Sequence, residues 1–413
     1  MDCIMSDSKN FKNIFPWKND DKYYFVRLDE FFTKPLNLWE VEPCLYSALK
    51  KFINDGKWTL DARKTENILK FIHSSSKVAN EELESKREKY FTSLCSKFRK
   101  PFLYGIEITN SCNFKCQYCY LKYENKPKMS VACFKKCVDN ICEADGLIIN
   151  VTGGEPSLNS ELVDNLGYAA RSGLAVVVRT NLYRLPKGIE NLAGYDRIAF
   201  VFSFHNIYEA KYDLFVGKKG GFKNLTDNIK KLKQLNIKHC AQVVLTSENQ
   251  DSIKEILEWL TDNNIPHVIN EQIFPSIQPK GLVDDNHCFA ESGCISKLIS
   301  EKILSRSRMR CTATTCKLWI GSDGVVYPCE FMKNNPIGDL TTAGVDLIGI
   351  TNGELADSWR TTNLKYNSGF KEECNACEHK QHCPSCPAFA SLGDSYIEAH
   401  CRRTREIMKM VNI

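Results

Sequence analysis

The stretch from Leu103 to Cys119 reads LYGIEITNSCNFKCQYC, and it decides how the rest of the chain is interpreted. Its first half, Leu103–Thr109, predicts a β-strand, and the loop that follows carries Cys112, Cys116 and Cys119. Three thiolates spaced four and three residues apart on one loop can converge on an iron–sulfur cluster. A zinc site would require a fourth ligand, and the sequence has no suitable histidine nearby.

Composition points to metal or redox chemistry as well. The chain has 413 residues and 20 cysteines, which is above ordinary usage but below that of a small disulfide scaffold. Its length predicts two or three domains, with a core large enough to form without disulfides. The apolar share of 43% and the charged share of 25% exclude a disordered or collagen-like chain. The cysteines therefore need a reason other than folding.

Charge and hydropathy indicate the cellular location and the partners to expect. No apolar run is long enough for a membrane span, and the N-terminus lacks the features of a signal peptide. We therefore expect a cytoplasmic protein with reduced thiols and no membrane partner. The net charge of +5, from 55 basic and 50 acidic residues, gives no reason to expect nucleic acid as a partner.

Predicted strands and helices alternate from residue 102 onward. The predicted strands are Leu103–Thr109, Leu147–Val151, Ala175–Arg179, Ile198–Ser203, Cys240–Leu245 and His267–Glu271. The predicted helices between them are Val131–Glu143, Ser160–Arg171, Phe222–Leu235 and Ser252–Asp262. Repeated βα units build a parallel sheet, because their crossovers are right-handed. The predicted fold class is α/β, a partial (β/α)6 barrel with its chemistry on loops at the carboxyl ends of the strands.

The two ends of the chain differ from this central pattern. Residues 1–100 predict a small α+β module with a strand at Lys22–Asp29 and short helices, which suits either peptide binding or capping of the next domain. Residues 306–413 are turn-rich and cysteine-rich, with a hairpin around Asp323-Gly324 and a final basic helix at Tyr396–Met410. The predicted domains are therefore 1–100, 101–305 and 306–413.

The cysteine loop resembles the signature of the radical S-adenosylmethionine (SAM) superfamily. That signature has three cysteines at this spacing and an aromatic residue before the last, a place that Tyr118 fills. The resemblance implies that Cys112, Cys116 and Cys119 hold a 4Fe–4S cluster whose open iron binds SAM. It further implies an electron donor such as flavodoxin or ferredoxin. Reductive cleavage of SAM would give a 5′-deoxyadenosyl radical that abstracts a hydrogen atom, while the protein positions and shields the cofactor.

Further motifs follow in the order that the resemblance implies. The family's GGEP motif is matched by Gly153, Gly154, Glu155 and Pro156. Glycines at such a turn let the backbone approach a ligand closely. Asn181 and Ser203 match positions that often contact SAM, although polar residues at strand ends are also commonly structural. The family often has aspartate two residues after that serine, where this chain has His205.

The C-terminal cysteines resemble the SPASM extension of many radical SAM enzymes. The resemblance implies a first auxiliary 4Fe–4S cluster on Cys311, Cys316, Cys329 and Cys386. It implies a second auxiliary cluster on Cys374, Cys377, Cys383 and Cys401. One departure is the spacing between Cys383 and Cys386, which holds two residues where the common form has three. A pair of structural zinc sites is the alternative, because zinc ribbons use similar cysteine pairs.

Glu330 directly follows Cys329, at a place where related maturases have an acidic residue that can serve as a base. An exposed structural glutamate is the alternative for this residue.

Taken together, these resemblances imply a radical SAM/SPASM peptide maturase. It would act on a ribosomally made precursor peptide and form a thioether or carbon–carbon crosslink, with residues 1–100 binding the leader by strand addition. Thioether-forming enzymes of bacterial peptides are the relatives that it resembles in order and length. The alternatives are an anaerobic sulfatase maturase, which forms formylglycine, and a non-catalytic zinc-binding scaffold.

Overall fold

The computed structural model describes most of the central and C-terminal parts of the chain and the first strands. The described residues are 14–19, 22–28, 35–41, most of 99–270, 311–368, 371–379, and single positions or short runs within 43–51 and 383–405. Most of the predicted N-terminal helices (Leu45–Asn54, Ala62–His73 and Glu81–Lys100) and the end of the predicted helix Tyr396–Met410 lie outside the described residues.

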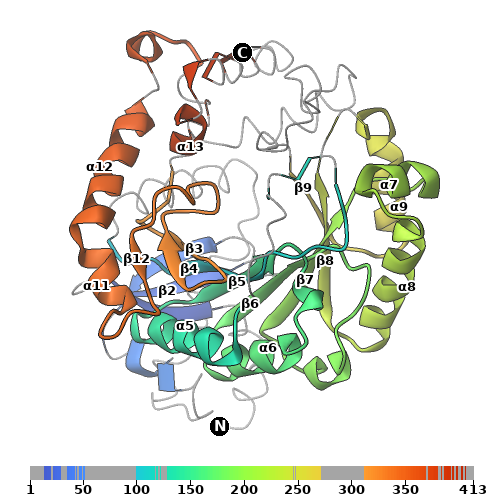
Figure 1. The fold of residues 1–413 in the computed structure, drawn as a ribbon, viewed down its shortest axis with the longest axis horizontal. Helices are drawn as coiled ribbons and strands as arrows, with labels where there is room; N and C mark the ends of the chain where they lie inside the picture. Colours follow the sequence, from blue (N-terminus) through green and yellow to red (C-terminus); the bar gives the residue numbers. More distant parts are fainter. Residues whose placement is uncertain are drawn as a thin grey trace.

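The centre of the molecule is a nine-stranded sheet with the order β12-β11-β10-β4-β5-β6-β7-β8-β9 (Figure 1). Six consecutive strands in it are parallel to one another. They are β4 (Leu103–Thr109), β5 (Ile148–Gly153), β6 (Ala175–Thr180), β7 (Ile198–Phe204), β8 (Lys238–Val244) and β9 (His267–Asn270). The α/β fold with six parallel strands is therefore confirmed, as an open sheet in the described part of the chain.

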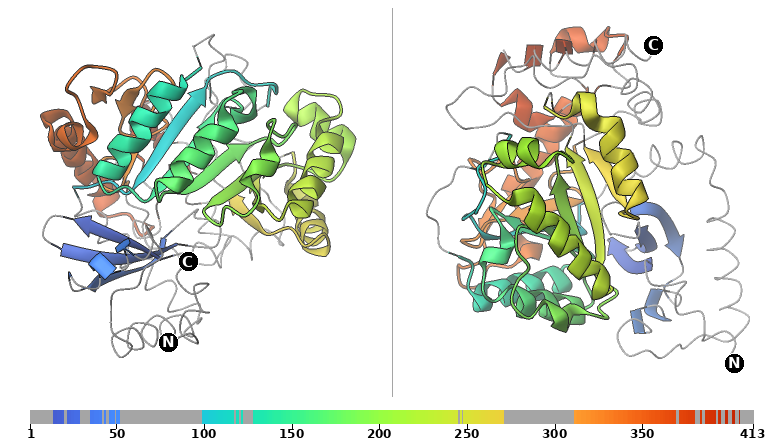
Figure 2. Two further views of the ribbon diagram at one scale, coloured as in Figure 1. Left: turned by 90° about the horizontal axis from the view of Figure 1, so that it is seen from below. Right: turned by 90° about the vertical axis from the view of Figure 1, so that its right-hand side faces the viewer.

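Helices connect these strands and cover one face of the sheet (Figure 2). They are α5 (Val131–Glu143), α6 (Leu162–Arg171), α7 (Glu209–Val216), α8 (Gly221–Gln234) and α9 (Ile253–Asp262). Short 3₁₀ turns lie at Pro156–Leu158, Ile189–Leu192 and Gln250–Ser252. The sequence predicted each of these α-helices except α7. Ser130 caps the N-terminus of helix α5, because its hydroxyl accepts a hydrogen bond from the Cys133 N–H at 3.1 Å.

Alternate residues of each strand enter two different cores. Residues such as Val176, Val178 and Phe200 face the helices, where they join the main hydrophobic cluster. Their neighbours Val177 and Ala199 face the opposite side and join a second, smaller cluster. Since side chains alternate along a strand, a sheet that is covered on both faces needs apolar residues at both sets of positions.

A three-stranded antiparallel sheet lies against the second face (Figure 2). It consists of β1 (Ile14–Asn19), β2 (Lys22–Leu28) and β3 (Pro35–Val41). Phe15 and Trp17 are fully buried in the second cluster, where the Trp17 ring meets Phe102 edge-on with centroids 5.4 Å apart. The sequence predicted β2 alone among these strands. The sheet packs beside the first residues of the parallel strands, away from the edge that carries the cysteine loop.

The C-terminal region extends the central sheet. Strand β10 (Lys317–Ile320) pairs parallel to β4, and the predicted hairpin continues into β11 (Val325–Tyr327), followed by β12 (Gly338–Asp339). Helices α11 (Leu347–Asn352) and α12 (Glu354–Ser368) follow, then a 3₁₀ turn at Glu372–Asn375 and α13 (Pro387–Ala390). The sequence predicted the hairpin but not its pairing with β4, nor α11 and α12 in a region that reads as turn-rich.

Strands β4 and β10 approach each other closely at one point. The Trp319 ring lies over Gly105, where an added Cβ would come within 1.9 Å of the ring. A residue without a side chain is therefore required on β4 for this contact. In the part of the chain that the structure describes, no helix has the length and apolarity needed to cross a membrane.

The second core supplies a test of how the N-terminal sheet is held. Replacing Trp17 by Ala should lower the free energy of unfolding by about 3 kcal/mol or more, because a large buried ring is lost from the contact with Phe102. Leu214→Ala is the matched control, since its side chain is 75% exposed and should change stability by about 0.5 kcal/mol at most. Urea unfolding measures both, and equal effects would contradict this packing.

Candidate functional site

The cysteine loop leaves the sheet at the carboxyl end of β4. Cys112, Cys116 and Cys119 are all partly buried, and the Cys119 N–H donates to the Cys116 carbonyl at 3.1 Å. The loop is also tied to the end of α7, since the Lys115 N–H donates to the Val216 carbonyl at 2.9 Å. The three thiols thus lie at the edge where the chemistry of such a fold is expected.

The glycine pair of the GGEP motif lies directly against this loop. The Gly154 N–H donates to the Thr109 carbonyl at 2.8 Å. A Cβ on Gly153 would come within 2.0 Å of the Thr109 oxygen, and one on Gly154 within 2.2 Å of the Ser111 oxygen. Gly153 also has a φ of +136°, which residues with side chains rarely adopt. The glycines are therefore needed for the close approach of two backbones beside the cysteine loop.

Glu155 faces inward and joins its own turn to the end of β6. It is fully buried. One carboxylate oxygen accepts from the Thr180 hydroxyl at 2.7 Å and from the Ser157 N–H at 3.0 Å, and the other accepts from the Asn181 N–H at 2.7 Å. Burial raises the pKa of this carboxyl, and the bonds from Asn181, Thr180 and Ser157 oppose that rise. Its structural role is to fix the end of β6 beside the GGEP turn. The next residue, Pro156, is also buried.

The Asn181 side chain reaches the cysteine loop. Its side-chain amide donates to the Asn113 side-chain oxygen at 2.7 Å and lies 3.9 Å from the Cys112 sulfur. Its own side-chain oxygen accepts from the Tyr183 N–H at 2.9 Å. The Asn181 side chain is thus oriented from both ends, with its amide beside the first thiol.

Tyr118 lies over the end of β7. Its ring stacks on Phe215 with centroids 5.6 Å apart and meets His205 edge-on at 5.2 Å. Ser203 hydrogen-bonds to the Tyr118 side chain, so two of the predicted cofactor-binding residues meet directly. His205 is buried, and burial lowers the pKa of its imidazole to about 3. The residue that replaces the family's aspartate is therefore a neutral support for the Tyr118 ring.

The environment of the Cys112 and Cys116 thiols disfavours their negatively charged thiolate form unless a cation is bound nearby. Burial, with the charges of Glu155 and Cys119, raises the pKa of the Cys112 thiol to about 11. Burial also raises the pKa of Cys116 well above its usual value, and both neighbouring thiols add to this effect. Among the described residues, no three acidic, histidine or thiol groups converge closely enough to hold a single metal ion. The donor set is nevertheless one that an iron–sulfur cluster uses, since its iron stabilises thiolates.

Three of the C-terminal cysteines gather around one small hydrophobic cluster. Cys329 is buried in it, and Cys311 and Cys386 pack against it. Burial and the charge of Cys386 raise the pKa of the Cys311 thiol to about 12. The fourth predicted ligand, Cys316, is buried and packs with Phe102 in the second core. The structure therefore brings together three of the four predicted ligands of the first auxiliary cluster.

The predicted ligands of the second auxiliary cluster are Cys374, Cys377, Cys383 and Cys401. Burial raises the pKa of the Cys401 thiol, and the nearby Cys374 and Cys377 add to that rise, so these three lie close to one another. The Lys371 N–H donates to the Cys374 sulfur at 3.5 Å. Cys383, the fourth, is partly buried.

Glu330 forms an ion pair rather than standing exposed. Its carboxylate lies 2.6 Å from the Lys317 Nζ atom, and its side chain is 18% exposed. Burial alone would lower the pKa of Lys317, but the charges of Glu330 and Cys329 raise that pKa above its usual value. Lys317 therefore stays positively charged beside Glu330, next to a predicted cluster ligand.

A second charged contact, which the sequence did not reveal, ties the C-terminal region to β4. Glu107 is 2% exposed, and its carboxylate accepts hydrogen bonds from the Trp319 indole N–H at 2.8 Å and from Lys333 at 2.7 Å. Lys333 stands four residues after Cys329. A charged residue between the apolar Ile106 and Ile108 is the signal in the sequence that could have indicated a partner for Glu107. Its partners come from more than 200 residues away, so only the tertiary structure identifies them.

The comparisons with known proteins agree with this geometry. Residues 106–260 match the sequence model of the radical SAM superfamily. The match begins within β4, includes the cysteine loop and the GGEP turn, and ends in α9. Residues 106–260 therefore form a radical SAM domain, and that family implies SAM and a 4Fe–4S cluster as cofactors.

Curated relatives include enzymes of several kinds. The chain is 24% identical over 247 residues to the Fe-coproporphyrin III synthase of Methanosarcina barkeri, covering 58% of this chain and 61% of that protein. It is 28% identical over 177 residues to the subtilosin biosynthesis protein AlbA of Bacillus subtilis, covering 41% and 39%. It is 25% identical over 162 residues to the sporulation killing factor maturation protein SkfB of the same organism, covering 38% and 39%. Each alignment thus spans less than two thirds of the relative.

Solved structures share the fold over a longer part of the chain. Streptococcus suis SuiB bound to the precursor peptide SuiA has a TM-score of 0.61 at 15% identity, covering 92% of this chain and 95% of that one. The enzyme anSMEcpe with bound AdoMet and a Cp18Cys peptide has a TM-score of 0.57 at 15% identity, covering 76% and 98%. At these identities the comparison establishes the fold.

The close approach at the GGEP turn supplies a test of the site. Gly154→Ala should weaken SAM binding about tenfold or more, or by about 1.4 kcal/mol, because its methyl group would push the Ser111 carbonyl and the cysteine loop aside. Gly349→Ala in α11 is the control, since a methyl group there meets the end of the Asp346 side chain at 3.3 Å. Anaerobic titration calorimetry with SAM measures both, and unchanged affinity in Gly154→Ala would contradict the assignment.

Proposed function

We propose that this protein is a radical SAM peptide maturase that forms a thioether or carbon–carbon crosslink in a ribosomally made precursor peptide. The observation that carries the proposal is the convergence, at one sheet edge, of the cysteine loop, the GGEP turn, Asn181 and the Tyr118–Ser203 contact. The fold that the chain shares with SuiB, solved with its precursor peptide, supports a peptide substrate. AlbA and SkfB support bacterial peptide maturation as the context.

In this proposal, Cys112, Cys116 and Cys119 hold the cluster that supplies, when bound, the electron for cleaving SAM. The backbone at Gly153 and Gly154 lies close enough to the loop to receive the methionine end of SAM. The Asn181 amide beside Cys112 orients the polar part of the cofactor. Tyr118, supported by the neutral His205, forms an apolar wall for the adenosyl group.

Two auxiliary clusters complete the proposed cofactor set. The first is assigned to Cys311, Cys316, Cys329 and Cys386. The second is assigned to Cys374, Cys377, Cys383 and Cys401. The grouping of three thiols in each set supports the assignment. With one cluster in the radical SAM domain, the loaded protein would hold about twelve irons, reduced by a donor such as flavodoxin or ferredoxin in the cytoplasm.

Crosslinking removes two hydrogens from the peptide. One leaves as a hydrogen atom to the adenosyl radical, and the other leaves as a proton and an electron. We assign the proton to Glu330, whose carboxylate is held beside Lys317 at 2.6 Å, and the electron to an auxiliary cluster. The ion pair with Lys317 keeps the Glu330 carboxylate ionised and fixed in position, and a base must be positioned within hydrogen-bond reach of the proton that it accepts.

A second candidate is an anaerobic sulfatase maturase. The fold shared with anSMEcpe and the position of Glu330 favour it. Product mass separates the two activities, because a crosslink lowers the peptide mass by two hydrogens, whereas conversion of a thiol to an aldehyde removes sulfur. The N-terminal sheet, which a maturase of folded sulfatases does not require, favours the crosslinking enzyme.

Two variants test the division of roles within the site. The triple variant Cys112→Ala, Cys116→Ala, Cys119→Ala should lose SAM cleavage but keep about eight irons, those of the auxiliary clusters. Glu330→Gln should keep SAM cleavage while crosslinked product falls about a hundredfold, since loss of a positioned base costs about that much. Iron and zinc analysis, 5′-deoxyadenosine release and peptide mass measure these outcomes.

Retained SAM cleavage in the triple variant would refute the assignment of the cysteine loop. Zinc without iron in the wild-type protein would favour the scaffold alternative over any radical enzyme.

Leader binding is assigned to the three-stranded N-terminal sheet. Its order β1-β2-β3 leaves β3 with one strand neighbour among the described residues, and an extended peptide can add there by main-chain hydrogen bonding. Strand β1, by contrast, is held against the central sheet through Phe15 and Trp17. The leader would therefore add along Pro35–Val41.

Hydrogen exchange on the full chain tests this assignment. A synthetic peptide corresponding to a short open reading frame beside the gene should slow amide exchange in Pro35–Val41 about tenfold or more, because added strand hydrogen bonds protect the edge. Central strand β6 is the internal control and should not change. Protection confined to the cysteine-loop edge, with none in β3, would show that the leader binds elsewhere.

A further inference from the structure

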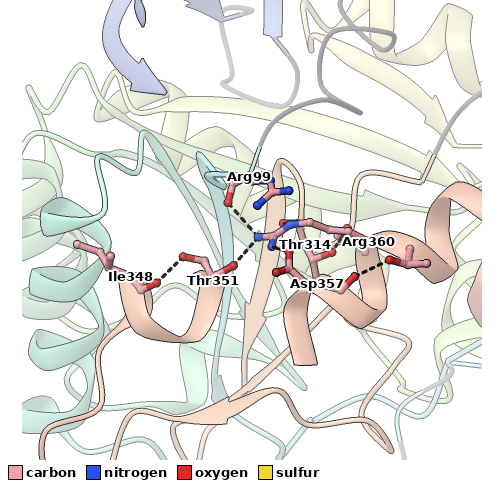
Figure 3. Close-up of polar contacts among 8 residues, drawn as sticks. Arg99, Thr314, Ile348, Thr351, Asp357 and Arg360 are labelled. Carbon is pink, nitrogen blue, oxygen red and sulfur yellow. Dashed lines mark hydrogen bonds and ion pairs between the residues drawn. The ribbon is translucent and has the colours of Figure 1, made fainter. Parts of the chain in front are cut away.

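Arg360 joins three distant segments of the chain. It lies on α12 and is 8% exposed. Its guanidinium donates to the backbone carbonyls of Thr314 at 3.1 Å, Thr351 at 2.6 Å and Arg99 at 2.9 Å, and it pairs with Asp357 at 2.8 Å (Figure 3). The three carbonyls belong to the turn before β10, to the end of α11 and to the segment that leads into β4.

One of these acceptors is in an unusual backbone conformation. Thr314 has a φ of +63°, in the left-handed region that β-branched residues rarely adopt. Its N–H donates to the Lys317 carbonyl at 2.8 Å, and its side chain is fully buried. Such a conformation costs about 1–3 kcal/mol and persists only where surrounding contacts hold it. Arg360 supplies one of those contacts by binding the Thr314 carbonyl.

The strained turn directly follows a predicted cluster ligand. Cys311 stands three residues before Thr314 and packs against the hydrophobic cluster that contains Cys329, where Cys386 also packs. The residue before Arg360, Trp359, packs against the same cluster. Helix α12 therefore contacts the cysteine group through Trp359 and the turn through Arg360.

Lysine could not replace this arginine without loss. A guanidinium presents five N–H donors in a planar fork, whereas an ammonium is a point charge on a flexible stem. Arg360 uses its Nε atom and both terminal nitrogens on four acceptors, one on its own helix and three backbone carbonyls from other segments. A buried carbonyl left without a donor would lower the stability of the folded protein.

We propose that Arg360 is a positioning residue, which holds Thr314 in its left-handed conformation and so keeps Cys311 beside Cys329 and Cys386 as a ligand of the first auxiliary cluster. The role rests on the proposed function for the presence of that cluster. It extends the proposal to a residue that contacts neither the cluster ligands nor the substrate by hydrogen bonding.

The test combines Arg360→Lys with Thr314→Gly in the full chain, reconstituted anaerobically. Arg360→Lys should lose about four irons and the electron paramagnetic resonance signal of one auxiliary cluster, while SAM cleavage continues. Thr314→Gly alone should keep all clusters, because glycine adopts a positive φ freely. The double variant should regain most of the lost iron, since the turn then no longer needs the arginine to offset its strain.

Arg197→Lys is the matched control, because Arg197 also donates to a backbone carbonyl, that of Gly173, which lies on the turn after α6 and belongs to neither predicted auxiliary-cluster region. It should keep about twelve irons. Twelve irons in both the wild type and Arg360→Lys would refute the role of Arg360 and leave the proposed function intact. About four irons in the wild type would refute the auxiliary clusters themselves, and this role with them.

Loss of iron in Arg360→Lys without recovery in the double variant, accompanied by loss of cooperative unfolding of the iron-free protein, would show a general structural role and would also overturn the proposal.

Discussion

Strand β4 is paired on both sides, and most of the site depends on this double pairing. On one side it pairs with β5 of the radical SAM domain, and on the other with β10 of the C-terminal region. The cysteine loop begins where β4 ends, so its position relative to the GGEP turn and to Cys329 is set by these two ladders. Glu107, buried within β4, reinforces the second ladder by binding Trp319 and Lys333. Breaking a buried charged contact of this kind is costly, because it leaves an uncompensated charge.

The backbone is tightly constrained at two places where function is proposed. Gly153 and Gly154 allow two backbones to meet at distances that any side chain would prevent. Thr314 keeps a left-handed conformation in the turn next to Cys311. In both places contacts with another segment hold the local chain, since Asn181 bonds to Glu155 beside the glycines and Arg360 bonds to Thr314. Strain of this kind is retained where surrounding structure offsets its cost.

The repeating part of the fold could be predicted from the sequence. Leu103–Thr109 and Val131–Glu143 have the bounds that local pattern indicated, because a buried parallel strand and an amphipathic helix each have a strong periodic signal. Strands β1 and β3 were missed because each contains a proline, which argues against a strand, and α7 was missed because its eight residues have no clear apolar face. Helix α12 was missed because its surroundings are rich in turn-forming residues. The partners of Glu107 were unpredictable because contact across such a separation leaves no local pattern.

By itself, the sequence identified the kind of chemistry, because the spacing of Cys112, Cys116 and Cys119 and the order of the motifs after them resemble the radical SAM signature. It also determined that six βα units form a parallel sheet, since periodicity and handedness act within each unit. Only the tertiary structure decided that Cys316 is buried with Phe102 in the second core, that Glu330 is paired with Lys317, and that Arg360 supports the turn at Thr314. These features arise from contacts between segments far apart in the chain, and such contacts form only when the sheet and helices have been brought together.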